Sequence, residues 1–276
     1  MSEMPHPTVA EVTGLALRRG QGRHVARALP EEVPVAVVCN GTTQAVMMAS
    51  PADLEDFALG FALSEGFITD PAQIERLEIA DHAQGIEARL WLDAERAEAL
   101  AARRRAMAGP VGCGLCGIDS LDQATRPLPH LPAPGWTMTP TALLGAAEAL
   151  RAHQPIHDRT LGVHAAGFVA PDGTIRLARE DVGRHNALDK LIGALRRAGI
   201  DPAGGAVVMT SRLSMELVQK TVVAGVPVLA AVSVPTGYAV RLAEAAGLTL
   251  VGCARGGGLE VFTHPARIET GENDVA

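Results

Sequence analysis

The second half of the chain alternates short apolar runs with longer stretches of helical character, and this rhythm constrains the fold more than any other feature. The apolar runs lie at Ala206–Met209, Val226–Ser233 and Leu248–Gly252. The stretches between them, Leu213–Ala224 and Thr236–Ala246, favour helices. Strands that alternate with helices form βαβ units, and strands without polar positions indicate that both sheet faces are covered. The sequence therefore predicts a three-layer α/β domain with a mostly parallel sheet.

This domain is expected to begin after a stiff connector. Four prolines fall within residues 127–134, a pattern that favours an extended linker, which we place at residues 126–136. The domain then covers residues 137–276. Its first expected elements are a helix at 139–153, strands at 161–170 and 174–178, and a helix at 184–197.

The sequence pattern of residues 1–125 predicts a smaller N-terminal α+β domain that ends in a loop rich in Gly and Cys. Asn40-Gly41 lies between two apolar runs, which is typical of a tight β-hairpin. Ser50, Pro51 and Asp53 then form a helix-start pattern with Ser50 as the N-cap. The elements expected here are strands at 33–39, 45–49 and 85–93, and helices over 53–62 and 94–108.

Composition and charge exclude several classes of function. The net charge of −7 opposes binding to nucleic acid or anionic lipid, and 3% aromatic residues leave few rings for stacking on bases. No apolar run approaches the roughly 20 residues that span a bilayer, and the first five residues lack a signal-peptide pattern. Four cysteines in 276 residues do not form a disulfide framework. We expect a cytoplasmic protein that binds neither nucleic acid nor membranes.

Polar and glycine residues follow each predicted strand of the second half. Parallel strands end at one sheet edge, where ligands bind, and helix N-termini, glycine backbone and Arg side chains are the groups that hold phosphates. Helix capping alone explains Ser or Thr at these positions equally well, but caps do not require Arg. The candidate binding residues are Arg184, His185, Asn186, Ser211, Arg212, Thr236, Cys253, Ala254, Arg255, Gly256, Gly257 and Gly258.

Cys113 and Cys116 form a CxxC pair inside the glycine-rich segment 109–117. This spacing serves dithiol redox chemistry, zinc binding or persulfide transfer. No other Cys or His completes a zinc-finger pattern, so we expect no structural zinc, and the glycines oppose the helix that a thioredoxin-like site opens. A mobile loop suits a thiol that collects sulfur at one place and delivers it at another. The alternative is a pair of unreactive thiols in a flexible segment.

His164 precedes small residues that leave room for a ligand, although a buried, satisfied His on a strand is the alternative. The zinc deaminase signature is not met, because Ala166 stands where the Glu would be and the CxxC precedes the His. In the segment 180–190, Arg184 and His185 fall in the first turn of a predicted helix. The helix dipole disfavours cations there unless an anion binds, which indicates a binding site. Asp181 is expected to cap this helix, and Asp189 and Lys190 are explained by a solvated helix face.

Together these motifs resemble the FdhD family of formate dehydrogenase accessory sulfurtransferases, and the resemblance covers nearly the whole chain. The motifs that carry it are the Gly-Cys-Gly-Leu-Cys-Gly loop, Gly162–Ala166, Glu180–Lys190, Ser211–Ser214, Pro235-Thr236, Leu248–Gly252 and Val261–Pro265.

The resemblance implies a homodimer with a cytidine deaminase-like C-terminal fold that lacks the deaminase zinc. It further implies that Cys113 accepts persulfide sulfur from a cysteine desulfurase. The sulfur would pass to the molybdenum or tungsten bis-pterin guanine dinucleotide cofactor of formate dehydrogenase. That cofactor would bind at the sheet edge, including residues 253–258, and a guanine nucleotide would mimic it. In this family an aromatic residue is expected where this chain has Cys253.

Two other functions are consistent with the sequence. A non-catalytic chaperone would bind the cofactor and apo-formate dehydrogenase without using Cys113 as a sulfur carrier. A dithiol oxidoreductase would require both Cys113 and Cys116 and would form a reversible disulfide between them. The sequence does not assign a role to Cys116.

Overall fold

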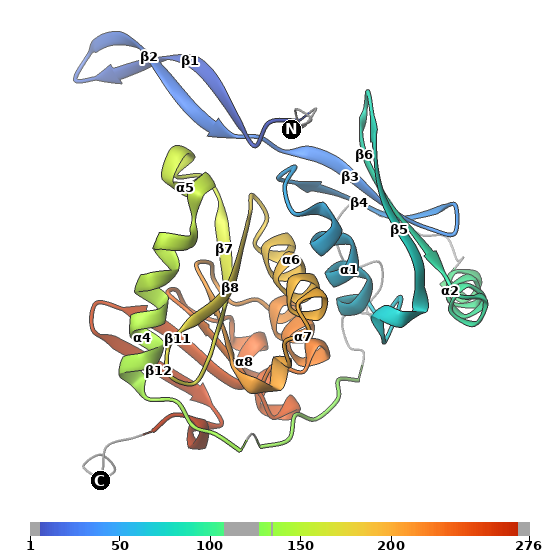
Figure 1. Ribbon diagram of the computed structural model, residues 1–276. Helices are drawn as coiled ribbons and strands as arrows, with labels where there is room; N and C mark the ends of the chain where they lie inside the picture. The colour runs from blue at the N-terminus through green and yellow to red at the C-terminus, as the bar shows by residue number, and fades with distance from the viewer. Residues whose placement is uncertain (1–5, 108–126, 134, 270–276) are drawn as a thin grey trace.

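A computed structural model describes residues 6–107, 127–133 and 135–269 of the chain, apart from the side chains of 103–107. Figure 1 shows a mixed α/β protein in which two sheets lie on opposite sides of a layer of helices. Cys113 and Cys116, and the loop predicted around them, lie outside the described residues.

The larger sheet has six strands in the order β12-β11-β10-β9-β7-β8. Strands β9 to β11 pair in parallel, as the apolar runs predicted, whereas β7, β8 and β12 pair antiparallel with their neighbours. The prediction of a mostly parallel sheet was therefore correct only for the three central strands, because both edges are formed by hairpins. The strands are β7 (His164–Val169), β8 (Ile175–Asp181), β9 (Ala206–Met209), β10 (Val228–Ala231), β11 (Thr249–Arg255) and β12 (Gly258–Thr263).

Helices cover both faces of this sheet, which confirms the three-layer prediction. One apolar cluster places Met138 and the buried face of α4 against strands β7, β9, β10 and β11. On the other face, a larger cluster joins the sheet to α6, α7 and α8. The helices are α4 (Pro140–Ala149), α5 (Pro155–Thr160), α6 (Arg184–Arg197), α7 (Met215–Ala224) and α8 (Gly237–Ala246). Short 3₁₀ helices lie at Pro71–Gln73, Leu150–His153, Pro202–Gly204 and Pro265–Arg267.

The smaller sheet has the order β4-β3-β6-β5 and packs one face on α1. The predicted hairpin at Asn40-Gly41 is confirmed, since both residues have positive φ between the paired strands β3 and β4. Strand β5 was not predicted. The elements are β3 (Val33–Cys39), β4 (Thr42–Ala49), α1 (Leu54–Ser64), β5 (Ile74–His82), β6 (Gly85–Leu92) and α2 (Ala94–Met107).

An unpredicted hairpin, β1 (Val9–Arg18) with β2 (Gln21–Pro30), extends away from the body of the molecule (Figure 1). Its alternation of apolar and polar residues is weak, and no strand was therefore predicted there. The predicted division at residues 126–136 stays a prediction. One continuous apolar cluster contains side chains from both the small sheet and the large one.

Helices α1 and α6 cross at a pair of glycines, Gly60 and Gly193. A Cβ atom on Gly60 would lie 1.7 Å from the carbonyl oxygen of Asp189, and one on Gly193 would lie 1.9 Å from the carbonyl oxygen of Asp56. Glycine lowers helix stability by roughly 1 kcal/mol relative to Ala. Glycine is nevertheless present at both positions because a side chain at either one would collide with the backbone of the other helix. This close contact of two backbones joins the N-terminal and C-terminal parts of the chain.

We expect Gly60→Ala to lower the free energy of unfolding by roughly 3 kcal/mol, because the added methyl group would overlap the Asp189 carbonyl and force the two helix backbones apart. Denaturant unfolding followed by circular dichroism measures this change.

Gly145→Ala is the matched control. It also replaces a helical glycine, but nothing lies within 4 Å of the added methyl group. It should raise stability by roughly 0.5–1 kcal/mol. A Gly60→Ala protein as stable as the wild type would show that the α1–α6 crossing tolerates wider spacing.

Candidate functional site

Strands β8, β9, β10 and β11 run in the same direction and therefore end at one edge of the large sheet. The loops that leave this carboxyl edge carry the candidate residues. Arg184 and His185 begin α6, Ser211 and Arg212 follow β9, Thr236 precedes α8, and residues 253–258 close β11. The fold thus brings the predicted segments to the same edge, while their role in binding stays a prediction.

Backbone hydrogen bonds join the loop after β9 to the loop after β10. The Thr236 amide donates to the Leu213 carbonyl at 2.9 Å, and the Leu213 amide donates to the Val234 carbonyl at 3.3 Å. Thr236 also caps α8, since its Oγ1 accepts from the Ala239 amide at 3.2 Å. The capping explanation therefore holds for Thr236. Arg212, by contrast, is exposed at this edge.

The glycine run after β11 forms a hairpin turn. Arg255 pairs with Gly258, and Gly256 and Gly257 between them have φ of 62° and 82°. Two positive φ values in a two-residue loop favour glycine, so the turn alone accounts for these residues. The following strand, β12, was not predicted. Cys253, at φ 55°, lies where the register of β11 and β12 shifts, and its amide donates to the Ser233 carbonyl at 3.0 Å.

The start of α6 combines several unsatisfied donors. The N-cap residue Gly183 supplies no side-chain acceptor for the first helical amides. The Nε of Arg184 is buried and lacks a hydrogen-bond partner among the described residues. Burial first, and then the Arg184 charge, lowers the pKa of His164. Free amides and a guanidinium in one place fit an anionic ligand such as a phosphate.

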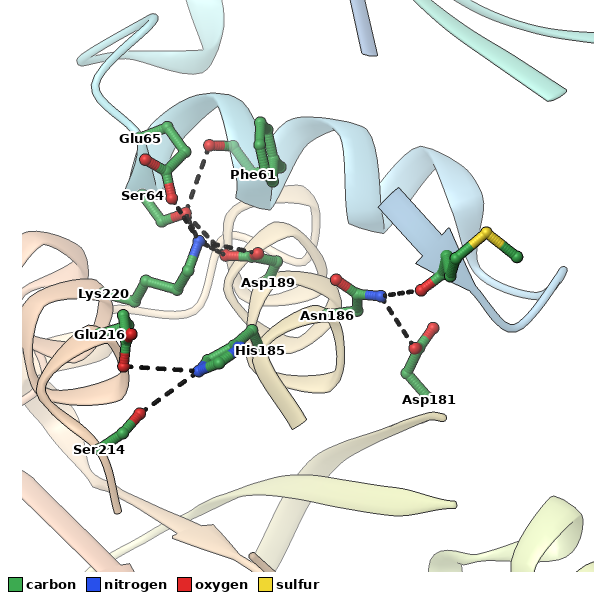
Figure 2. A network of polar contacts seen from close by, with 11 residues as sticks. Phe61, Ser64, Glu65, Asp181, His185, Asn186, Asp189, Ser214, Glu216 and Lys220 are labelled. Atoms are coloured by element: carbon green, nitrogen blue, oxygen red, sulfur yellow. Dashed lines mark hydrogen bonds and ion pairs between the residues drawn. The ribbon is translucent and has the colours of Figure 1, made fainter. Parts of the chain in front are cut away.

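His185 lies beside this helix start and contacts α7. Figure 2 shows its Nε2 facing both the Ser214 hydroxyl, at 3.3 Å, and the Glu216 carboxylate, at 3.8 Å. Because one ring nitrogen faces both partners, these residues do not form a Ser-His-acid triad, in which each nitrogen binds a different partner. Burial, followed by the nearby Arg184 charge, lowers the pKa of His185 to about 4. The ring is therefore neutral at pH 7.

The prediction of a solvated face at Asp189 and Lys190 was wrong, because both side chains are fully buried. The Lys190 ammonium lies 2.7 Å from the Asp181 carboxylate and donates to the Ser50 carbonyl at 2.9 Å. A solvated face was predicted because two adjacent charged residues in a helix are usually exposed. Here α1 covers that face of α6, and each charge has a buried partner.

Ser50 also departs from its predicted role. Asp53, not Ser50, occupies the N-cap position of α1. The Ser50 amide donates to the Asp181 carboxylate at 3.0 Å, and its hydroxyl accepts from the Val182 amide at 3.1 Å. Ser50 thus joins the N-terminal part of the chain to the segment that precedes α6. Asp181 accepts the Gly183 amide at 2.8 Å, just before the helix.

A second buried pair involves Lys220, a residue that was not predicted from the sequence to have a role. Its ammonium lies 2.9 Å from Asp189 Oδ2 and 2.7 Å from Glu65, and Ser64 donates to Asp189 Oδ1 at 2.7 Å (Figure 2). Burial raises the pKa of Asp189 to about 6, while the Lys220 charge opposes that rise. A lysine between the apolar residues of α7 was a signal of such a pair. This network joins α1, α6 and α7 directly behind His185.

Two other candidates have internal partners. The Asn186 side chain is buried, and its Nδ2 donates to the Met48 carbonyl at 2.8 Å and to Asp181 at 3.0 Å. Ser211 is also buried, and its hydroxyl donates to the Arg212 carbonyl at 3.0 Å. Cys39, a cysteine with no predicted function, is buried, which raises the pKa of its thiol to about 12 and makes it a poor nucleophile.

Within the described ranges, no three His, Cys, Asp or Glu side chains are grouped as metal ligands. Nor does any described helix have the length and apolar character needed to cross a membrane.

The His185 geometry predicts a pH dependence. The folded pKa of about 4 lies below the ordinary 6.5, so the folded state binds fewer protons than the unfolded state between these values. This difference in bound protons contributes to the free energy of unfolding above pH 6.5, and the contribution is lost as pH falls toward 4. Between pH 7 and pH 4, His185→Gln should lose about 3 kcal/mol less stability than the wild type in denaturant titrations. Parallel pH profiles for the two proteins would show that the ring protonates freely in the folded state.

Comparison with known proteins extends the resemblance. Residues 30–269 match the FdhD/NarQ family. The chain is 50% identical over 257 residues to "Sulfur carrier protein FdhD" of Agrobacterium fabrum, covering 93% of this chain and 95% of the relative. It is 44% identical to the protein of the same name from Bordetella petrii, over 96% of both chains.

A solved structure has the same overall fold. It is described as a putative formate dehydrogenase accessory protein from Desulfotalea psychrophila, and it superposes with a TM-score of 0.76 at 24% identity. The alignment covers 95% of this chain and all of that one. The cytidine deaminase-like description of the C-terminal part stays a prediction. The family match over residues 30–269 and the identities of 44–50% to named relatives show that this chain belongs to the FdhD/NarQ family.

Proposed function

We propose that this chain is a sulfur carrier for the maturation of formate dehydrogenase. It accepts sulfur from a cysteine desulfurase as a persulfide on Cys113. It passes that sulfur to the molybdenum or tungsten bis-pterin guanine dinucleotide cofactor, which is bound as a substrate at the carboxyl edge of the large sheet. The observation that carries the proposal is the 50% identity, over almost the whole chain, to a protein named as a sulfur carrier.

The chemistry follows from thiolate reactivity. The Cys113 thiolate attacks the outer sulfur of a persulfide on the donor cysteine. A bond forms between that sulfur and Cys113 Sγ, the donor S–S bond breaks, and the donor cysteine leaves as a thiolate. Release of the carried sulfur as sulfide takes up two electrons. The Cys116 thiolate supplies them by attacking Cys113 Sγ and closing a disulfide.

The sheet edge supports the binding of a dinucleotide. The unpartnered Arg184 Nε and the free amides of the first turn of α6 suit one phosphate. Arg212 and Arg255, both exposed at the same edge, suit others. Neutral His185 adds no positive charge of its own, so the net attraction at the helix start comes from Arg184 and the helix dipole.

Intact-mass measurement tests the sulfur-carrying step. The protein is incubated with a cysteine desulfurase and cysteine, and its mass is recorded without reductant. We expect the wild type to gain sulfur that reductant removes, and Cys113→Ala to gain none. Cys116→Ala should load sulfur but retain it when an acceptor is added, because the disulfide can no longer form.

The control is Cys253→Ala, which removes a partly exposed thiol outside the CxxC pair and should load normally. If the wild type gains no sulfur from a competent donor, the carrier proposal fails, and a cofactor-binding chaperone becomes the better account.

Nucleotide binding tests the sheet edge separately. Arg184→Gln should weaken the binding of GDP about tenfold or more, because a charge-assisted hydrogen bond contributes roughly 1.5–3 kcal/mol. Isothermal titration calorimetry gives the Kd. Arg176→Gln is the control, since this exposed arginine lies at the opposite end of β8 and should leave the Kd unchanged. Equal weakening by both substitutions would point to a general charge effect.

A further inference from the structure

A cavity of about 320 Å³, partly open to solvent, lies beside the edge strand β8. Four segments that are distant in sequence line it: residues 8–9 at the base of the β1–β2 hairpin, 52–53 before α1, 153–159 around α5, and 178–180 of β8. Figure 1 shows α5 beneath the hairpin. None of the candidate residues of the sheet edge lines this cavity. Small-molecule sites occupy roughly 300–1,000 Å³, so a small ligand fits here.

Internal hydrogen bonds hold the walls of the cavity in place. The Glu180 carboxylate accepts the Ile156 amide at 2.8 Å and the His157 amide at 2.9 Å, which fixes α5 against β8. The Glu31 amide donates to the Thr8 carbonyl at 3.0 Å and closes the base of the hairpin. The cavity is therefore a feature of packed segments, and a ligand inside it would contact all four of them.

Two charged side chains that line the cavity can still pair with a ligand. The Arg159 guanidinium is exposed and has no hydrogen bond or ion pair within the described ranges. The only cation within 4.0 Å of the Asp53 carboxylate in the described chain is Arg179, at 3.7 Å, and Arg179 already donates to Asp56 at 2.7 and 2.8 Å. The Asp53 side chain does not cap α1 either. One free cation and one weakly paired carboxylate thus line the same space.

The rest of the lining is mainly aliphatic. Its apolar members are Val9, Ala52, Pro155, Ile156 and Ala178. An apolar group that enters such a space is removed from water, which favours binding. Opposite charges beside an aliphatic wall suit a zwitterion with an apolar side chain. A simple anion would leave the carboxylate of the cavity unpaired, and a simple amine would leave the guanidinium unpaired.

We propose that this cavity binds a free α-amino acid with an aliphatic side chain. Arg159 pairs with the carboxylate of the amino acid, Asp53 accepts from its ammonium, and its side chain packs on the aliphatic wall. A sphere of this volume is about 8.5 Å across, enough for two hydrogen bonds of about 2.9 Å and the short span between the ammonium and the carboxylate. This site goes beyond the proposed sulfur-carrier function, with which it shares no residue.

Isothermal titration calorimetry with L-leucine and L-methionine tests the site. We expect saturable binding, together with a rise in Tm, because a ligand that binds only the folded chain stabilises it. N-acetyl-L-leucine lacks the ammonium and L-leucinamide lacks the carboxylate. Each should bind about tenfold more weakly than L-leucine, since each leaves one charge of the cavity without its partner.

Substitutions of the two charged residues give the same test from the side of the protein. Arg159→Gln and Asp53→Asn should each weaken the binding of L-leucine about tenfold. Asn is tolerated in the left-handed conformation that residue 53 adopts, at φ 52°, so Asp53→Asn keeps the backbone. Arg176→Gln is the control, since this exposed arginine of β8 does not line the cavity and should leave the Kd unchanged. Circular dichroism confirms that each variant is folded.

Several results would overturn the proposal. One is the absence of saturable binding of both amino acids at millimolar concentrations. Others are equal affinity for the two analogues, unchanged affinity in either charge variant, or equal weakening by Arg176→Gln. Because the titrations contain neither a desulfurase nor a nucleotide, none of these results bears on the sulfur-carrier proposal.

Discussion

The close crossing of α1 and α6 at Gly60 and Gly193 is the contact on which the rest of the structure depends. It brings the backbones of the N-terminal and C-terminal parts close together. Buried charged side chains of one part can therefore reach polar groups of the other. Lys190 reaches the Ser50 carbonyl across this contact, and Lys220 reaches Glu65. A buried charge without its partner costs several kcal/mol, so the glycines and the ion pairs fix the same arrangement.

This arrangement determines the surroundings of the candidate site. Asp181 is held by Lys190 and Ser50 just before α6, and it accepts the Gly183 amide at the N-cap. The direction of the first turn of α6, and with it the position of Arg184, therefore depends on Ser50, which lies 131 positions before Asp181 in the chain. Neutral His185 lies between this helix start and α7. Sulfur delivery to a cofactor bound at the edge would rely on this support.

Periodicity and turn chemistry predicted much of the fold. Helix α6 and strand β9 have the predicted bounds, and the Asn40-Gly41 hairpin is present. The β1–β2 hairpin was missed because its alternation is weak, and β12 was missed because the Gly256-Gly257 pair suggested phosphate binding more readily than a hairpin turn. Ser50 was assigned to a helix cap because Ser followed by Pro is typical of one, whereas its backbone and hydroxyl bind the segment before α6.

The sequence by itself determined the α/β class, the family and the CxxC pair, because these depend on local periodicity and on motifs that are contiguous in the chain. The order of strands and helices also predicted that the polar loops meet at one sheet edge, since strand direction follows from that order. Only the tertiary structure decided which charges are buried. Asp189 and Lys190 were assigned to a solvated helix face from the sequence, but both are buried. Their burial depends on the packing of α1 against α6, which the local sequence does not encode. The lowered pKa of His185 has the same origin, since desolvation comes from distant segments that pack around the ring.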